Sequence, residues 1–358
     1  MRLVALLLAL AACGDAPLID VATAQPAPKR ANPDRKFEHH GQAMGTTISL
    51  FFWGDDEAAA AKAAEAVFKE MKRIDQVMTT WTPDSEVSQI NSNAGIKPVV
   101  VSEETFAVIE RAQDVAKRTR GIFDITVGAF KGLWKFDQDM DGTLPDQAEV
   151  KKRLQLIGYR DVVLDKAKKS VFLRRKGMSI TLGGIAKGYA VDKCVALLHA
   201  MNFTDFMVQA GGDMYIAGKK GAAPWVVGIR DPRGNQNPGK EMAPFASMPI
   251  EDHSFSTSGD YERGFVKDGV RYHHILDPRT GQPARASRSV TVKAKDAFTA
   301  DAWSKVMFIL GYKEALELIK REKLTDFEVV WVDDKNEIHQ TKGIEGQLTV
   351  IRPPTPGI

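Results

Sequence analysis

Residues 182–192 read Leu-Gly-Gly-Ile-Ala-Lys-Gly-Tyr-Ala-Val-Asp, and a helical pattern continues from there to about residue 200. A helix that opens on a Gly-Gly turn presents free backbone amides and the positive end of its dipole to whatever lies above it. Lys187 adds a cation in the first turn. This combination suits a pyrophosphate, although its spacing is neither that of a Walker A loop nor that of the Rossmann glycines. A helix start that needs glycine for close packing is the alternative.

The segments around this turn alternate between helical and β-rich patterns, but not in a strict βαβ order. The run 46–53 predicts the first strand, and the acidic residues 55–57 predict a helix start. Further helices are predicted at 102–120, 146–156, 185–200, 298–309 and 312–321, and short strands at 161–164, 170–174, 178–182, 206–209, 214–217, 225–230, around 265, and at 271–275, 289–293 and 327–332. This order of elements predicts an α+β fold.

The composition is that of an ordinary globular chain. Its 358 residues allow one large domain or two lobes, and an apolar fraction of 44% suffices for a sizeable core. The formal net charge is only +3, and acidic and basic residues alternate along the chain. We therefore expect no nucleic-acid partner.

The N-terminus reads as a lipoprotein signal at residues 1–13. A short positive start precedes the apolar run 4–10, and Leu-Ala-Ala then precedes Cys13. The pattern predicts that Cys13 becomes an acylated N-terminus, and the run is too short to span a bilayer, which takes about 20 residues. The alternative is a plain signal peptide with an accidental cysteine. Residues 14–36, rich in Ala, Pro and charge, predict a flexible tether to the membrane.

Two further motifs combine glycine with side chains that could contact a ligand. Met44 and Gly45 lead into the first strand, where glycine lets a backbone approach a ligand closely. Residues 121–128, Gly-Ile-Phe-Asp-Ile-Thr-Val-Gly, place Asp124 beside an aromatic ring, which suits an adenine or a ribose. A packed turn in which Asp124 caps the next element is equally compatible.

A histidine pair follows the polar stretch 256–263. Adjacent residues of a strand point to opposite faces, so His273 and His274 cannot both face one site. We therefore expect one functional histidine, a general base, rather than a two-histidine metal site.

Asp301 lies in an otherwise apolar helix start, Thr-Ala-Asp-Ala-Trp-Ser-Lys at 299–305. A lone carboxylate is costly to bury unless it is paired or binds a metal. Mg²⁺ is usually held by one or two carboxylates plus phosphate. The alternative is a surface pair between Asp301 and Lys305 at i,i+4.

Taken in order, these motifs resemble the ApbE family of FAD:protein FMN transferases over residues 37 to about 332. The resemblance rests on Met-Gly-Thr at 44–46, Ser85-Glu86 with Asn91, the segments 122–128 and 182–190, Gly211-Gly212-Asp213, Thr-Ser-Gly-Asp-Tyr at 257–261, His-His-Ile-Leu-Asp-Pro at 273–278 and Ala-Asp-Ala at 300–302. It implies a T-fold-related mixed α/β core, with antiparallel sheets flanked by helices, at residues 37–340. A C-terminal tail is expected at 341–358.

The resemblance also implies a reaction. The family splits the pyrophosphate of FAD, releases AMP, and joins FMN by a phosphoester to a Ser or Thr of a target subunit in a membrane redox complex. Members are often anchored on the periplasmic side of the inner membrane, which fits Cys13. The alternatives are a Mg²⁺-dependent FAD pyrophosphatase that releases FMN and AMP, and an FAD-binding lipoprotein without turnover.

The family's site residues can be carried over by position. His274 matches a general base, and the Asp301 carboxylate and the Gly184 carbonyl match Mg²⁺ ligands. Contacts to FAD fall on Met44, Trp81, Ile122, Phe123, Asp124, Thr181, Lys187 and Ile275.

Two positions depart from the family pattern. Thr181 stands where many relatives carry Asp, and Lys305 stands where a Thr hydroxyl often completes the metal site. We expect Lys305 to swing out along the helix and leave Mg²⁺ to Asp301, the Gly184 carbonyl, water and phosphate. In the alternatives, its ammonium pairs with Asp301 and either replaces the charge of the metal or blocks the metal.

Overall fold

The computed structural model describes residues 35–136, 139–234 and 243–358. The predicted signal sequence, Cys13 and all but the last two residues of the predicted tether lie outside the described residues. Among the described residues, no helix has both the length and the apolar character needed to cross a bilayer.

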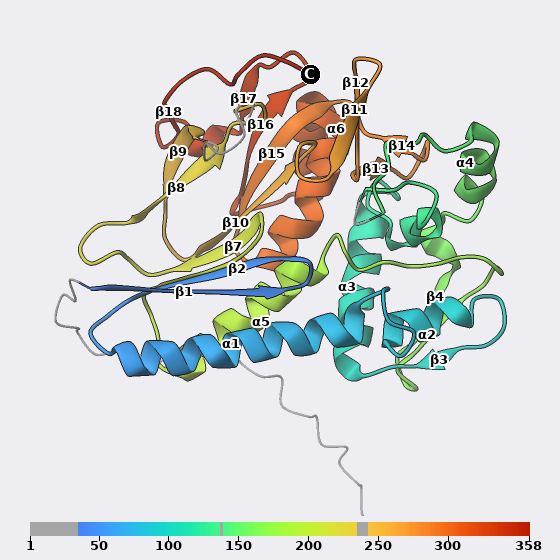
Figure 1. Cartoon of the computed structure of the whole chain (residues 1–358), viewed down its shortest axis with the longest axis horizontal. Coiled ribbons are helices and arrows are strands. Elements are labelled where there is room, and N and C mark those ends of the chain that lie inside the picture. Colours follow the sequence, from blue (N-terminus) through green and yellow to red (C-terminus); the bar gives the residue numbers. More distant parts are fainter. Residues whose placement is uncertain (1–34, 137–138, 235–242) are drawn as a thin grey trace, which may run out of the picture.

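An eight-stranded antiparallel sheet lies at the centre of the fold (Figure 1). Its strands follow the order β1-β2-β6-β7-β10-β15-β16-β17, so strands far apart in sequence become neighbours. Their bounds are β1 (Lys36–Ala43), β2 (Thr46–Trp53), β6 (Phe206–Ala210), β7 (Asp213–Ala217), β10 (His253–Gly259), β15 (Ser287–Ala294), β16 (Phe327–Asp333) and β17 (Ile338–Gln340).

Three helices cover one face of this sheet: α1 (Glu57–Met78), α5 (Ala186–Ala200) and α6 (Ala297–Glu322). In Figure 1, α1 runs along the lower edge, and α6 rises beside β15. Helix α6 packs on β10 and β15, and α5 packs between α1 and α6. The main hydrophobic core lies under these helices and includes Phe52, Phe206 and Trp303.

The other face of the sheet carries a second layer of strands. β8 (Trp225–Arg230), β9 (Pro244–Ile250) and β18 (Thr349–Val350) form a three-stranded sheet. A second core, which includes Trp225, Phe245 and Phe255, lies between the two sheets. The fold is therefore a layer of helices, a central sheet and a smaller outer sheet.

A smaller lobe forms between α1 and α5 along the chain and lies to the right in Figure 1. It contains α2 (Glu86–Ser92), α3 (Glu103–Arg118), α4 (Gln147–Leu154), the short helices η1 (Ile125–Phe130) and η2 (Tyr159–Asp161), and a sheet of β3 (Val99–Val100), β5 (Ser170–Leu173) and β4 (Val162–Asp165). Two hairpins, β11 (Gly264–Lys267) with β12 (Val270–His273) and β13 (Leu276–Asp277) with β14 (Gln282–Pro283), reach this lobe. The Trp134 indole donates to the Gly281 carbonyl at 2.9 Å and joins the lobe to the second hairpin.

The predicted first strand and first helix are confirmed. β2 covers residues 46–53, and the Asp56 side chain caps α1 by accepting from the Ala59 amide at 2.9 Å. The buried side chains Val67, Met71, Ile74 and Met78 follow the helical period that the sequence indicated. The α+β fold class with antiparallel sheets is confirmed as well.

Other predictions are corrected by the structure. Residues 178–182 are not a strand, because the Asn91 side chain and the Ile125 carbonyl hold this segment in place of a neighbouring strand. The two helices predicted at 298–309 and 312–321 belong to one element, α6, which kinks at Gly311 with φ of +70°.

The segment 341–358 is part of the domain, not a tail. Ile344 in η3 (Lys342–Ile344) is buried, and β18 pairs with β9. The Thr355 hydroxyl and amide both donate to the buried Asp231 carboxylate, at 2.6 and 3.1 Å. These contacts move the domain boundary beyond residue 340.

Candidate functional site

The N-terminus of α5 and the start of α6 meet at Gly188. Its amide donates to Asp301 Oδ2 at 2.9 Å. A Cβ atom at position 188 would lie 2.3 Å from the Ala297 carbonyl oxygen, far inside contact distance, so this glycine is needed for close packing. At Gly183 and Gly184 a Cβ would meet only ordinary contacts. Packing therefore does not explain the glycines of the turn. The expectation of free amides is corrected in part, because the Gly183 amide donates to the Thr181 hydroxyl and the two amides that follow Gly184 donate to the Leu182 carbonyl.

Two lysines and two aspartates meet beside this junction. Lys187 Nζ contacts Asp213 Oδ2, and Lys305 Nζ contacts Asp301 Oδ1. Both aspartate side chains are buried, at 2% and 0% exposure, whereas the lysines keep 22% and 18%. We call these four residues the lysine–aspartate cluster. The cluster joins α5, β7 and α6, and its charges balance when all four groups are ionised.

The cluster shifts the pKa values of its own members. Burial raises the pKa of Asp213, but the charges of Lys187 and Lys305 outweigh burial, and the net shift is downward. Burial likewise opposes protonation of Lys187, but Asp213 and Asp301 outweigh it and raise the pKa of Lys187. Burial and the charge of Asp213 raise the pKa of Asp301. Lys187 is thus a cation and Asp213 an anion at neutral pH.

The pairing of Lys305 corrects the expectation that this side chain swings away from Asp301. Asp301 already has a donor on each carboxylate oxygen, the Lys305 ammonium and the Gly188 amide. A protonated ammonium cannot ligate a metal, and Mg²⁺ demands near-octahedral oxygen ligands. The Mg²⁺ that the resemblance implies therefore does not fit the donors that surround Asp301. The second ligand that the resemblance implies, the Gly184 carbonyl, lies on the α5 side of the junction.

The two histidines have different surroundings. His273 is buried, its Nε2 lies 2.8 Å from the Ala284 carbonyl oxygen, and burial lowers its pKa to about 4. His274 is exposed, and its Nδ1 lies 3.3 Å from the Arg263 carbonyl oxygen. Burial among the surrounding protein atoms and the neighbouring charges, including Lys305, lower the pKa of the His274 imidazole. The imidazole of His274 is therefore neutral at pH 7 and can accept a proton. Its catalytic role stays a prediction.

The residues expected at the flavin end lie around the first hairpin and the end of α1. Met44 has φ of +54°, and its amide donates to Asp75 Oδ2 at 2.9 Å. The Trp81 side chain is exposed, and Lys131 Nζ lies 4.4 Å from the centre of its ring. An exposed flat ring of this kind can stack on an isoalloxazine.

Asp124 is held as a helix cap. Its Oδ1 accepts from the Thr126 amide and hydroxyl at 2.8 and 2.6 Å, and its Oδ2 accepts from the Tyr159 amide at 2.8 Å. Burial raises the pKa of this carboxyl despite those donors. The capping interpretation therefore describes Asp124 in this structure, and its contact with FAD stays a prediction.

The loop that Asp124 holds faces the Gly-Gly turn. A Cβ at Gly184 would lie 3.5 Å from the Phe123 ring, and Ile122 and Phe123 are both mostly buried. The Thr181 amide donates to the Ile125 carbonyl, and its hydroxyl accepts from the Gly183 amide at 3.2 Å. The segments 121–128 and 182–192, far apart in sequence, are therefore neighbours, as one shared site requires. Ile275 is buried next to His273.

Asp213 was not predicted as a site residue. The sequence contains a signal for it, because Gly211-Gly212 brings the chain close to the first hairpin, where a Cβ at Gly211 would lie 2.7 Å from Thr46 Oγ1. A carboxylate directly after such a tight turn, at the start of a central strand, is a candidate partner for a buried cation.

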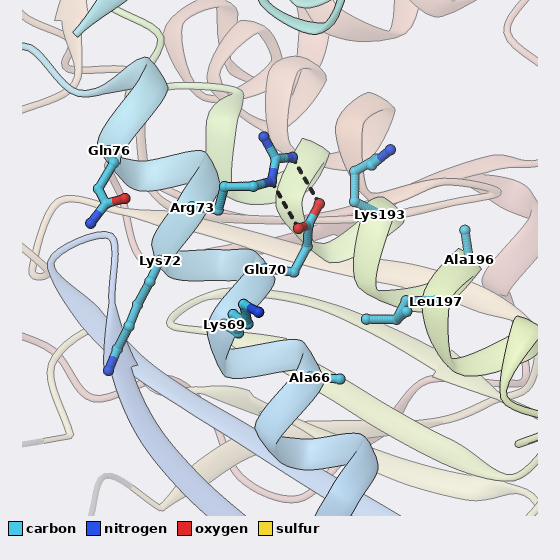
Figure 2. A pocket seen from close by; sticks show the side chains of 9 residues that line it. All are labelled: Ala66, Lys69, Glu70, Lys72, Arg73, Gln76, Lys193, Ala196 and Leu197. Carbon is cyan, nitrogen blue, oxygen red and sulfur yellow. Dashed lines mark hydrogen bonds and ion pairs between the residues drawn. The ribbon is translucent and has the colours of Figure 1, made fainter.

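A hollow of about 710 Å³ lies away from this cluster, between α1 and α5. Figure 2 shows Lys69, Lys72 and Arg73 on α1 and Lys193 on α5 around it. Arg73 donates to both Glu70 oxygens, at 2.8 and 2.9 Å, so its charge is neutralised locally. This hollow contains none of the predicted site residues.

Comparison with known proteins places the chain in a family. The model of the ApbE family matches residues 44–331. A protein named FAD:protein FMN transferase from Klebsiella pneumoniae (strain 342) is 32% identical over 306 residues, covering 85% of this chain and 92% of the relative. Another of that name, from Treponema pallidum (strain Nichols), is 33% identical over 333 residues, covering 88% and 90%.

Solved structures agree with these sequence comparisons. The ApbE protein from Thermotoga maritima has a TM-score of 0.78 with 34% identity, and covers 87% of this chain and 99% of its own. The flavin transferase ApbE from Vibrio cholerae has a TM-score of 0.76 with 25% identity, and covers 88% of this chain and all of its own. The chain belongs to the ApbE family.

Proposed function

We propose that this chain is an FAD:protein FMN transferase, which splits the pyrophosphate of FAD and joins FMN by a phosphoester to a Ser or Thr hydroxyl of a target protein. The activity is that of relatives aligned over more than four fifths of the chain. The observation that supports it within the molecule is the lysine–aspartate cluster at the N-terminus of α5, because cations and the positive end of a helix dipole stabilise a pyrophosphate.

The reaction is a displacement at phosphorus. The acceptor hydroxyl oxygen forms a bond to the phosphorus of the FMN half, and the bond from that phosphorus to the bridging oxygen breaks. AMP leaves with the bridging oxygen, and the hydroxyl proton passes to a base. Negative charge builds up on the phosphoryl oxygens, so preorganised donors lower the barrier.

Residues of this chain supply each part of that step. Lys187 and the positive end of α5 stabilise the phosphoryl oxygens, and the neutral imidazole of His274 takes the proton. Trp81 and Met44 hold the flavin ring, and the loop 122–124 positions the rest of the dinucleotide. No step is assigned to Mg²⁺, because both oxygens of Asp301 already accept hydrogen bonds from groups of the chain.

The partner and the location are the finer parts of the proposal. The target is a redox-complex subunit that carries a Ser/Thr-Gly-Ala-Thr-like signature. The sequence Leu-Ala-Ala-Cys supports a lipid anchor on Cys13 at the periplasmic side of the inner membrane. Cys13→Ser should move the protein from the membrane fraction to the soluble fraction, and an unchanged distribution would exclude the anchor.

The activity can be tested with purified protein, FAD and a target subunit that carries the signature. We expect flavin fluorescence in the target band of a denaturing gel. Free FMN and AMP without a labelled band would mean a pyrophosphatase, in which water replaces the hydroxyl. Intact FAD would mean a flavin-binding protein without turnover.

A further inference from the structure

Lys305 lies where the resemblance to the family places a divalent cation, and its ammonium already contacts Asp301 there. It stands one helical turn after Asp301 on α6, and its ammonium contacts the Oδ1 atom of that carboxylate. Asp301 is fully buried, and the Lys305 side chain keeps 18% exposure. The Lys305 side chain is therefore partly accessible, whereas the carboxylate that it contacts is not.

The other hydroxyls near Asp301 already have hydrogen-bond partners within the chain. The Ser304 hydroxyl donates to the Asp301 backbone carbonyl at 2.8 Å and pairs with the Ser258 hydroxyl at 2.8 Å. The Thr299 hydroxyl donates to Asp296 at 2.7 Å. Mg²⁺ would therefore have the Asp301 carboxylate as its ligand on α6, and the Lys305 ammonium already contacts that carboxylate.

The charge balance points the same way. The lysine–aspartate cluster contains two ammonium groups and two carboxylates, all at the junction of α5, β7 and α6. Without bound FAD, a dication added to this set would leave an excess of two positive charges among buried groups, which is unfavourable. The four groups alone therefore create no requirement for a dication.

Lys305 also lies within electrostatic reach of the groups that the reaction uses. Its charge acts on the candidate base His274, and it acts on Asp213, the partner of Lys187. Lys305 therefore lies close enough to His274 and to Asp213 for its charge to act on both.

We propose that the Lys305 ammonium takes the place of a divalent cation in this chain, so that the ammonium groups of Lys187 and Lys305 both donate hydrogen bonds to the FAD pyrophosphate and FMN transfer proceeds without bound Mg²⁺. The proposal rests on the proposed transferase function. The bonds made and broken are those given above, and the two ammonium groups stay protonated throughout, so no metal or further reactant enters the balance.

The test compares the wild-type protein with two variants at position 305, in excess chelator and in excess Mg²⁺. Wild-type transfer should differ by less than about 2-fold between the two conditions. Lys305→Thr removes the cation and supplies a hydroxyl, so transfer in chelator should fall about 10²-fold, the scale of losing one preorganised donor, and Mg²⁺ should restore it. Lys305→Met supplies neither, so Mg²⁺ should restore nothing. Lys313→Thr, at an exposed position of the same helix, is the matched control and should behave as the wild type.

Two binding measurements decide the matter independently of turnover. Quenching of FAD fluorescence should give the same affinity for the wild type in chelator and in Mg²⁺, and calorimetric titration with Mg²⁺ should show binding to Lys305→Thr but not to the wild type. Transfer by the wild type that is abolished in chelator, or saturable Mg²⁺ binding to the wild type, would overturn the proposal and leave the transferase function intact. Absence of transfer in every protein and condition would instead contradict the proposed function, and the Mg²⁺ titration would still decide the role of Lys305.

Discussion

Two sets of buried charges in this molecule differ in how exposed their cationic side chains are. Arg233, in the loop after β8, donates from Nη1 and Nη2 to the two oxygens of Asp260 after β10, at 2.6 and 2.7 Å, and the side chains are only 5% and 8% exposed. In the lysine–aspartate cluster the carboxylates are as deeply buried, but the two lysine side chains remain about one fifth exposed. The first pair is closed and joins two sheets. The second keeps its lysine side chains partly accessible.

The largest effect should follow from breaking the closed pair. Asp260→Ala leaves Arg233 buried and unpaired, which should destabilise the fold by about 3–5 kcal/mol. Chemical denaturation measures the loss, and the folded fraction should keep its affinity for FAD. A variant with normal stability would mean that water reaches Arg233 and that the pair is not closed.

Removing a cation from the lysine–aspartate cluster should affect turnover more than stability. Lys187→Met should lower the rate of FMN transfer about 10²–10³-fold, because it removes a preorganised donor from the phosphoryl group. The double variant Lys187→Met with Asp213→Asn is the control, since it leaves no unpaired buried anion. If the double variant transfers FMN at the wild-type rate, Lys187 serves only to neutralise Asp213. The lysine–aspartate cluster would then be structural, like the pair of Arg233 and Asp260.

The histidine pair offers a similar contrast between an exposed and a buried side chain, with a smaller expected effect. His274→Ala should lower the transfer rate about 10²-fold with FAD affinity and stability little changed, because the exposed ring acts as a base. His273→Ala should lower the melting temperature while the folded protein keeps its rate, because the buried ring packs against Phe308. Equal losses of rate from both variants would indicate a folding defect instead of a catalytic base.

The pH dependence should show the smallest change. Burial and neighbouring charges lower the pKa of His274 to about 3, and the base works in its neutral form, so lowering the pH from 8 to 5 leaves it unprotonated. The transfer rate should therefore show no inflection near the ordinary histidine pKa of 6.5. A tenfold fall in rate below pH 6.5 would mean that His274 titrates normally in the complex with FAD.

Much of the fold was predictable where side chains repeat with a clear period. The strand at 46–53 and the helix that begins at Glu57 followed from alternation, a cap and a helical stripe. β10 was not predicted, because its sequence is rich in serine and has no apolar alternation. Ser254, Ser256 and Ser258 are nonetheless buried, since each hydroxyl has a partner in the neighbouring strand or in α6.

The site was predictable as a set of residues but not as a network. The sequence placed Lys187, Asp301 and Lys305 near a phosphate, yet the pairing of Lys187 with Asp213 depends on β7 lying beneath α5. The choice between Lys305 swinging away and Lys305 pairing with Asp301 depends on how deeply the carboxylate is buried, which local sequence does not specify. At 0% exposure, Asp301 requires a partner for its charge.

The most direct test of the central claim is the amount of AMP formed per FMN joined to protein, measured with and without the target subunit. The lysine–aspartate cluster is proposed to activate the FAD pyrophosphate for attack by a protein hydroxyl. We therefore predict one AMP for each FMN found on the target by mass spectrometry, and little AMP when the target is omitted. AMP and free FMN released at the same rate without the target would contradict the account and identify a pyrophosphatase.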